Sequence, residues 1–281
     1  MPGPTLSPVL TMLDGRTIPQ VGLGVYKIAE AEAATAIGHA IEVGYRHVDT
    51  ASLYENEAAV GAAIRAASVP RDELFVTTKV GNGDHGYDRT LRAFDASMAK
   101  LGLDYVDLYL IHWPVPSQDL YVETWRALQA IRATGRALSI GVSNFATHHI
   151  DRLLADGGEA PVLNQVELHP WLPQTDVRSY DDAHGILTEA WSPLARGRVL
   201  GAGSSDSAVL ERLAAKHDRS VAQIVIRWHI QLGNVVIPKS VTPSRITENF
   251  EVFDFALDEQ DLAAIATLET GERTGRDPDD D

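Results

Sequence analysis

Short apolar runs alternate with longer segments of helical spacing along most of this chain. Runs of about four to eight residues rich in Val, Ile and Leu are typical of buried strands. Eight such runs follow one another, over residues 21–25, 45–50, 74–79, 106–112, 137–143, 162–167, 186–191 and 235–240. The intervening segments, such as 31–44, 55–68 and 88–102, carry apolar residues at the spacing of amphipathic helices. The pattern therefore predicts parallel strand–helix units.

Eight such units are the number that closes a (β/α)8 TIM barrel of about 250 residues. No linker, charge block or fixed repeat divides the 281 residues, so we predict an α/β fold with a single barrel domain over residues 1–281. Two short runs around Asp14-Gly15 predict a two-residue N-terminal β-hairpin that closes the bottom of the barrel. The acidic end, about residues 272–281, is predicted to be a flexible tail.

A doubly wound dinucleotide-binding sheet is the alternative architecture. Gly22-Leu23-Gly24 after a short apolar start resembles half of the dinucleotide fingerprint. However, Lys27 stands where the third glycine belongs. The glycine pair then indicates tight packing at the start of a barrel.

Charge and composition exclude several classes of function. With 39 acidic and 24 basic residues the net charge is −15, which repels phosphate backbones and anionic lipid. The absence of cysteine excludes disulfides, thiolate metal sites and a cysteine nucleophile. No signal peptide or membrane-length apolar stretch is present. We expect a cytoplasmic protein with a small-molecule partner, and no metal, nucleic-acid or membrane partner.

Polar residues stand at the ends of nearly all the predicted strands. They are Asp49, Tyr54, Lys79, His112, Ser143, Asn144, Gln165, Trp191, Lys239 and Ser240. Alone, each has an ordinary structural interpretation, such as a helix cap or a surface lysine. The C-terminal ends of barrel strands converge on one face, however, and this convergence favours a common site.

Four of these residues suggest acid–base chemistry. An ammonium near a phenol favours phenolate and lowers the pKa of the phenol by roughly 1 to 3 units, so Lys79 is expected to lower that of Tyr54. Asp49 would keep Lys79 charged and oriented. Tyr54 could then act as a general acid toward a carbonyl oxygen. His112 could donate a second hydrogen bond to that oxygen, with Trp113 as an aromatic wall.

Several motifs in order resemble those of the aldo-keto reductases, most of all the bacterial 2,5-diketogluconate reductase group. The resemblance extends from the hairpin to about Phe255. It rests on GYRHVDTASLYENE (44–57), TTK (77–79), VDLYLIHWP (106–114), SIGVSNF (139–145), NQVELHP (164–170), EAWSPLARG (189–197) and IPKSVTPSRITENFEVFDF (237–255).

The resemblance implies hydride transfer from NADPH to an aldehyde or ketone. Its catalytic residues would be Asp49, Tyr54, Lys79 and His112, with Tyr54 as the proton donor. The cofactor would be bound by Ser143, Asn144 and Gln165 at the nicotinamide amide, Trp191 at its ring, Ser192, Leu194 and Gly197 along the pyrophosphate, Lys239, Ser240, Val241 and Arg245 around the 2′-phosphate, and Glu248 and Asn249 at the adenine. The segment 239–245 also looks like an anion site in its own right, because two cations and two hydroxyls surround a helix start.

The substrate side departs from the family pattern. The family usually has Lys-Leu-Trp-Asn where this chain has Lys79-Val80-Gly81-Asn82, so a pocket indole is missing. The pocket is then either wider or rebuilt by the loop 81–88. We expect small dicarbonyl or keto-sugar substrates bound by Tyr26, Asn82, His112 and Trp113. Arg273 or Arg276 folding over the pocket is the alternative to a free tail.

Two other functions remain open from the sequence. One is a non-catalytic NADPH-sensing barrel, which the intact set of Asp, Tyr, Lys and His argues against. The other is an aldolase that forms a Schiff base on Lys79.

Overall fold

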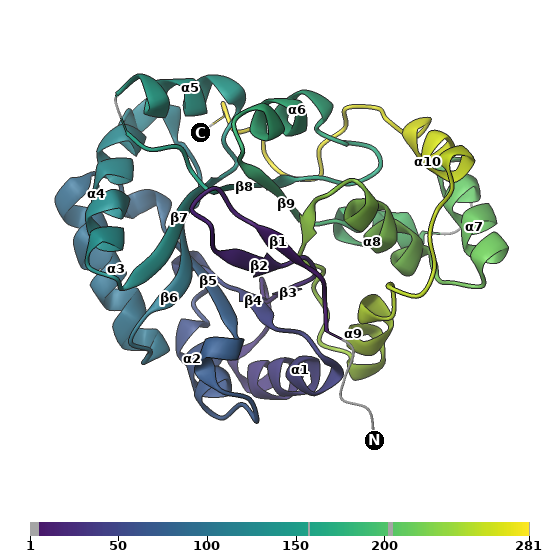
Figure 1. The fold of residues 1–281 in the computed structure, drawn as a ribbon, viewed down its shortest axis with the longest axis horizontal. Helices are drawn as coiled ribbons and strands as arrows, with labels where there is room; N and C mark the ends of the chain where they lie inside the picture. The colour runs from purple at the N-terminus through teal and green to yellow at the C-terminus, as the bar shows by residue number, and fades with distance from the viewer. Residues whose placement is uncertain (1–5, 157, 202–204, 281) are drawn as a thin grey trace.

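The computed structural model describes residues 6–156, 158–201 and 205–280, and its centre is a ring of parallel strands (Figure 1). The eight strands are hydrogen-bonded in the order β10-β9-β8-β7-β6-β5-β4-β3. They are β3 (Leu23–Gly24), β4 (His47–Asp49), β5 (Phe75–Val80), β6 (Val106–Ile111), β7 (Ala137–Ser143), β8 (Leu163–Glu167), β9 (Leu187–Trp191) and β10 (Val235–Val236). A parallel bridge between Val21 and Val236 joins the two edges. The predicted α/β barrel is therefore confirmed.

The strands are buried on both faces, as parallel strands usually are. In β6, Leu108 and Leu110 belong to a cluster inside the barrel, whereas Tyr109 and Ile111 pack in the layer between strands and helices. This alternation follows from the two-residue period of a strand. It leaves the end of each strand as the place where polar side chains can reach solvent.

Helices surround the ring, mostly one after each strand (Figure 1). They are α1 (Glu30–Val43), α2 (Glu57–Arg65), α3 (Tyr87–Leu101), α4 (Tyr121–Ala133), α5 (Thr147–Ala155), α6 (Thr175–Ala183), α7 (Ser205–His217), α8 (Val221–Gln231), α9 (Pro243–Phe250) and α10 (Glu259–Ala266). Two helices stop at glycines with positive φ, α1 at Gly44 and α3 at Gly102. Glycine adopts this conformation without a Cβ clash. None of the helices in the described ranges is both long and apolar enough to cross a membrane.

The N-terminal hairpin lies across the barrel, with β1 (Val9–Thr11) antiparallel to β2 (Thr17–Pro19) (Figure 1). Its Met12 and Ile18 complete the inner cluster, so the hairpin covers the barrel interior. The predicted two-residue turn is wrong. The Met12 amide donates to the Arg16 carbonyl, and three residues, 13–15, form the turn with Gly15 at φ 83°. A glycine in the left-handed region is usual in three-residue hairpin loops.

Candidate active site

A cavity of about 870 Å³ lies where the strands end. It is in the range of small-molecule sites, roughly 300–1,000 Å³. Asp49, Tyr54, His112 and Gln165 all line it, although they come from different parts of the chain. The predicted convergence of strand-end side chains is thus present in the geometry.

Lys79 lies beneath this cavity with no exposed surface. Its ammonium donates to both carboxylate oxygens of Asp49, at 2.7 and 2.8 Å, and to the carbonyl of Thr50 at 2.8 Å. Burial by itself opposes the charge on Lys79, but Asp49 offsets burial and the pKa of Lys79 is raised above its ordinary value. The lysine is therefore a fixed, buried cation.

Tyr54 ends a short 3-10 turn, η1 (Ser52–Tyr54), and its ring faces Lys79 and His112. The Lys79 nitrogen lies 5.1 Å from the ring centre, and the His112 ring lies 5.6 Å away. The expectation that Lys79 lowers the pKa of Tyr54 is wrong in its net direction. Burial raises the pKa of Tyr54 to about 12, although the Lys79 charge acts to lower it. The phenol consequently keeps its proton at neutral pH.

His112 is buried at the end of β6 and reaches the cavity. Burial and the positive charge of Lys79 hold the pKa of His112 well below its ordinary value. The imidazole is therefore neutral at physiological pH and carries a single N–H group. It can donate one hydrogen bond but is not a cationic acid.

All the residues predicted to bind the cofactor line the same cavity. They are Ser143, Asn144, Gln165, Trp191, Ser192, Leu194, Gly197, Lys239, Ser240, Val241, Arg245, Glu248 and Asn249. Asn144 and Ser192 have positive φ, 62° and 48°, directly after β7 and β9. Such backbone strain is often found at binding sites. It turns the chain sharply at the cavity wall.

Asn144 joins the residues that follow β6 to the end of β9 at the cavity wall. Its amide oxygen accepts from the Trp191 indole at 2.8 Å, and its amide nitrogen donates to the His112 carbonyl at 2.9 Å. The orientation of the Trp191 ring is thus coupled to the position of His112.

The far end of the cavity is positively charged. Lys239 and Arg245 are exposed there, and neither makes an ion pair within the described part of the chain. Arg196, in the segment 192–197 that was expected along the pyrophosphate, lines the cavity as well. Unpaired cations in a protein with a net charge of −15 indicate an anion site.

The other end is walled by Tyr26, Leu53 and Trp113. Leu53 was not predicted, because nothing in the sequence indicates that a side chain of η1 other than Tyr54 would line the cavity. Asn82 lies in another 3-10 turn, η3 (Asn82–Asp84), and does not line the cavity. Gly81 itself does not line the cavity, and a Cβ there would lie 3.2–3.4 Å from Ser52, Leu53 and Asp84, so these residues already fill the space next to it.

The C-terminal segment packs against this cavity, whereas a free tail was predicted. Backbone amides of Thr274 and Gly275 donate to the buried carboxylate of Glu167 at the end of β8, at 2.7–3.1 Å. A Cβ on Gly275 would lie 2.6 Å from the Trp191 ring. The guanidinium of Arg276 lies 5.2 Å from the centre of the Trp113 ring. Asp281, the last residue of the predicted tail, lies outside the described residues.

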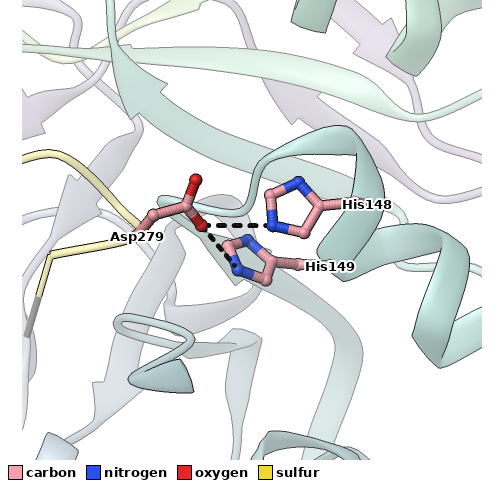
Figure 2. Close-up of side chains that lie close together, drawn as sticks. All are labelled: His148, His149 and Asp279. Atoms are coloured by element: carbon pink, nitrogen blue, oxygen red, sulfur yellow. Dashed lines mark hydrogen bonds and ion pairs between the residues drawn. The ribbon is translucent and has the colours of Figure 1, made fainter. Parts of the chain in front are cut away.

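The end of this segment is held by two histidines of α5 (Figure 2). Nε2 atoms of His148 and His149 both lie 3.1 Å from one carboxylate oxygen of Asp279. Three such groups could also suggest a metal site. However, Nδ1 of His149 accepts the backbone N–H of Ala146, so in the neutral ring Nε2 carries the proton and cannot bind a metal. The cluster instead joins the C-terminal segment to α5.

Comparison with known proteins agrees with this geometry. The sequence model of the Aldo/keto reductase family matches residues 20–270. Methylglyoxal reductase DkgA of Escherichia coli is 52% identical over 271 residues, which cover 96% of this chain and 97% of that protein.

Solved structures are equally similar. An aldo/keto reductase from Brucella melitensis is 52% identical with a TM-score of 0.88, over 93% of this chain and 98% of its own. A mutant of Gox0644 in complex with NADPH is 45% identical with a TM-score of 0.92, over 99% of both chains. With most of its length matched by the family model and by relatives at about half identity, this chain belongs to the aldo/keto reductase family.

Proposed function

We propose that this protein reduces small aldehydes and ketones with NADPH, and that Tyr54 is the proton donor. The proposal rests above all on the buried Asp49–Lys79 ion pair beneath the Tyr54 ring, in a cavity that also contains a neutral His112. Tyr54 is thus a proton donor and His112 a neutral hydrogen-bond donor in the same cavity. Reduction of a carbonyl group requires both, because negative charge develops on its oxygen.

The rest of the cavity fits NADPH. The oxygen of the Gln165 amide is available to a carboxamide N–H group, because both N–H groups of that amide are already bound by carboxyl oxygens. Ser143 and Asn144 would hold the same carboxamide, Trp191 the nicotinamide ring, and residues 192–197 the pyrophosphate. Lys239 and Arg245 would bind the 2′-phosphate, beside Glu248 and Asn249 at the adenine. When bound, NADPH supplies the hydride for the carbonyl carbon.

Tyr54 supports the reaction through its high pKa. A phenol with a pKa of about 12 remains protonated at neutral pH and gives up its proton only to a stronger base, such as an oxygen on which negative charge develops. The neutral N–H of His112 orients that oxygen with a second hydrogen bond. Lys79 stabilises the negative charge left on Tyr54 after proton transfer, because its ammonium is held charged by Asp49.

The alternatives have less support. Lys79 is a poor amine nucleophile for an aldolase, since its pKa is raised and its three N–H groups are directed at Asp49 and Thr50. Failure of borohydride to trap a carbonyl compound on Lys79 would remove this possibility. A purely sensory barrel would not need the Tyr54 and His112 arrangement.

The substrate class follows from the walls of the cavity and from relatives. Tyr26, Leu53 and Trp113 line the substrate end of the cavity beside the polar groups of Tyr54 and His112, which leaves a site of mixed polarity. Relatives about half identical to this chain are named methylglyoxal reductases. We therefore propose small dicarbonyls or keto-sugars as substrates, and a monomer that acts in the cytoplasm without nucleic-acid or membrane partners.

A turnover assay tests the proposal directly. The protein is mixed with NADPH and either methylglyoxal, a keto-sugar or an aromatic aldehyde, and the loss of NADPH absorbance is followed. We expect the highest kcat/KM for the small dicarbonyl or the keto-sugar. If NADPH is not oxidised with any of the three compounds, the proposed reductase activity is wrong. A preference for the aromatic aldehyde would overturn the proposed substrate class.

A further inference from the structure

A second carboxyl lies beneath the cavity and has no part in the mechanism above. Glu189, in β9, has no exposed surface and is the direct neighbour of Gln165 in β8. One of its oxygens, Oε2, accepts a hydrogen bond from Nε2 of Gln165 at 2.6 Å. A buried carboxyl this close to a cofactor-binding side chain calls for a physical reason, because burial of an acid is costly.

The amide of Gln165 has both of its N–H groups in use. Nε2 donates to Asp49 Oδ2 at 2.8 Å as well as to Glu189 Oε2. Asp49 is an ionised acceptor because it forms the ion pair with Lys79, so only the nitrogen of the amide can face it. The amide oxygen then faces away from the carboxyls and remains an acceptor, and Gln165 lines the cavity.

The opposite side of Glu189 faces His47 in β4. Oε1 of Glu189 lies 3.8 Å from Nδ1 of His47, and neither atom has a hydrogen bond within the described residues. Nε2 of His47 lies 3.2 Å from the Thr77 hydroxyl. The carboxyl of Glu189 and the His47 ring therefore face each other without a hydrogen bond between them.

The charges around Glu189 agree with a protonated carboxyl. It faces His47 and Asp49 from β4, Lys79 from β5, and Gln165 from β8, while its neighbour in β10 is the apolar Val235. Burial and Asp49 raise the pKa of Glu189 to about 8, and burial and Lys79 lower that of His47 to about 3. At neutral pH the cluster then has one cation, Lys79, and one anion, Asp49.

We propose that Glu189 is a positioning residue: together with Asp49 it holds the Gln165 amide with its oxygen toward the cavity, and it lies close enough to the nicotinamide site for the charge of its carboxyl to change cofactor binding. This inference rests on the proposed function, because it assigns the ligand of Gln165 as the cofactor carboxamide. The oxidised nicotinamide ring is positively charged and the reduced ring is neutral. Ionisation of Glu189 therefore strengthens binding of NADP⁺ more than binding of NADPH.

Two variants separate the two parts of this role. Glu189→Gln retains an oxygen acceptor for Gln165 and cannot ionise, whereas Glu189→Leu removes the acceptor. Dissociation constants of NADPH and NADP⁺ are measured between pH 7 and 9.5 by quenching of tryptophan fluorescence. Glu57→Gln is the matched control, because Glu57 is another buried carboxyl that does not line the cavity.

At pH 7 we expect Glu189→Gln to bind NADPH like the wild type and Glu189→Leu to bind it about five- to tenfold more weakly, the effect of one lost hydrogen bond. In the wild type and in Glu57→Gln, NADP⁺ should gain affinity relative to NADPH as pH rises through about 8. In Glu189→Gln this ratio should stay constant. A Glu189→Leu protein that binds like the wild type, or a Glu189→Gln protein with the wild-type pH response, would overturn the proposal.

The outcome is independent of turnover. If the protein binds NADPH but reduces no carbonyl compound, the proposed reductase fails and the binding measurements still decide the role of Glu189. If it reduces carbonyl compounds and the Glu189 variants behave as wild type, only the role of Glu189 fails. Should Glu189→Leu not fold, Glu189→Ala removes the acceptor in its place, and the same weakening of NADPH binding is expected.

Discussion

The ammonium of Lys79 lies 5.1 Å from the centre of the Tyr54 ring, while its three N–H groups are matched by three oxygens of Asp49 and Thr50. Lys79 therefore acts on Tyr54 mainly through its charge. Because burial outweighs this charge, the phenol stays protonated, which suits a proton donor in the direction of reduction. The raised pKa also makes Tyr54 a less favourable base at neutral pH, the role that alcohol oxidation would require.

Replacement of Tyr54 by phenylalanine tests this role. Tyr54→Phe should lower kcat for carbonyl reduction by roughly 10² to 10⁴, the usual effect of removing a general acid. The dissociation constant of NADPH should stay near that of the wild type, since the hydroxyl is not assigned to the cofactor. Tyr87→Phe, in an exposed position on α3 away from the cavity, is the control. An unchanged kcat in Tyr54→Phe would rule out the proton-donor role.

Arg245 is predicted to select NADPH over NADH. It is exposed at the cationic end of the cavity and has no carboxylate partner within the described chain. Hydrogen bonds to charged groups contribute about 1.5–3 kcal/mol, so Arg245→Ala should weaken NADPH binding by about tenfold or more. NADH, which lacks the 2′-phosphate, should bind almost unchanged.

Arg92→Ala is the matched control for this substitution, because Arg92 is exposed on α3 and lies outside the cavity. It should bind both nucleotides like the wild type. Equal weakening of NADPH and NADH in Arg245→Ala would place the phosphate site elsewhere.

Gly275 is predicted to determine the position of the Trp191 ring. A methyl group there would lie 2.6 Å from the ring and 3.0 Å from the Glu167 carboxylate, so the ring or the C-terminal segment must move. Overpacking of this kind costs about 1–3 kcal/mol. Gly275→Ala should therefore weaken NADPH binding by about fivefold or more, measured by fluorescence quenching.

Gly83→Ala provides the comparison, since a Cβ at Gly83 meets no atom within 4 Å. Its NADPH affinity should equal that of the wild type. Wild-type affinity in Gly275→Ala would mean that the C-terminal segment does not support the ring.

Asp181 is predicted to make the stability of the fold fall as pH rises. It has no exposed surface, and burial raises its pKa to about 7 despite hydrogen bonds from Thr188 and Asn164. Between about pH 4, where an unfolded aspartate ionises, and pH 7, the folded protein retains a proton that the unfolded chain has lost. The stabilising contribution is thus complete below pH 4 and is lost as pH rises through 7.

Asp181→Asn removes this titration. Relative to wild type, its free energy of unfolding in urea should rise between pH 5 and pH 8, by more than about 1 kcal/mol in total. Asp182→Asn, the adjacent residue outside the core, should show no such trend. A difference between Asp181→Asn and wild type that is the same at both pH values would contradict the prediction.

Much of the fold and of the candidate site was predictable because strand periodicity and strand ends are local features. Eight apolar runs indicated the ring, and the polar residue after each run indicated the cavity wall. The barrel topology alone assigned Asp49, Lys79 and His112 to the C-terminal end of the barrel. Leu53 at the cavity wall and the hydrogen bond from Gly275 to Glu167 were missed, because they depend on a turn and on a C-terminal segment with no periodic pattern.

By itself, then, the sequence determined the architecture, the identity of the acid–base groups and the cationic end of the cavity, all of which follow from residue type and spacing. Tertiary structure alone decided the protonation states of Tyr54 and Glu189, since burial depends on every chain segment that surrounds a group. It also decided that residues 274–276 pack against the cavity, because that contact pairs residues about a hundred positions apart in the chain.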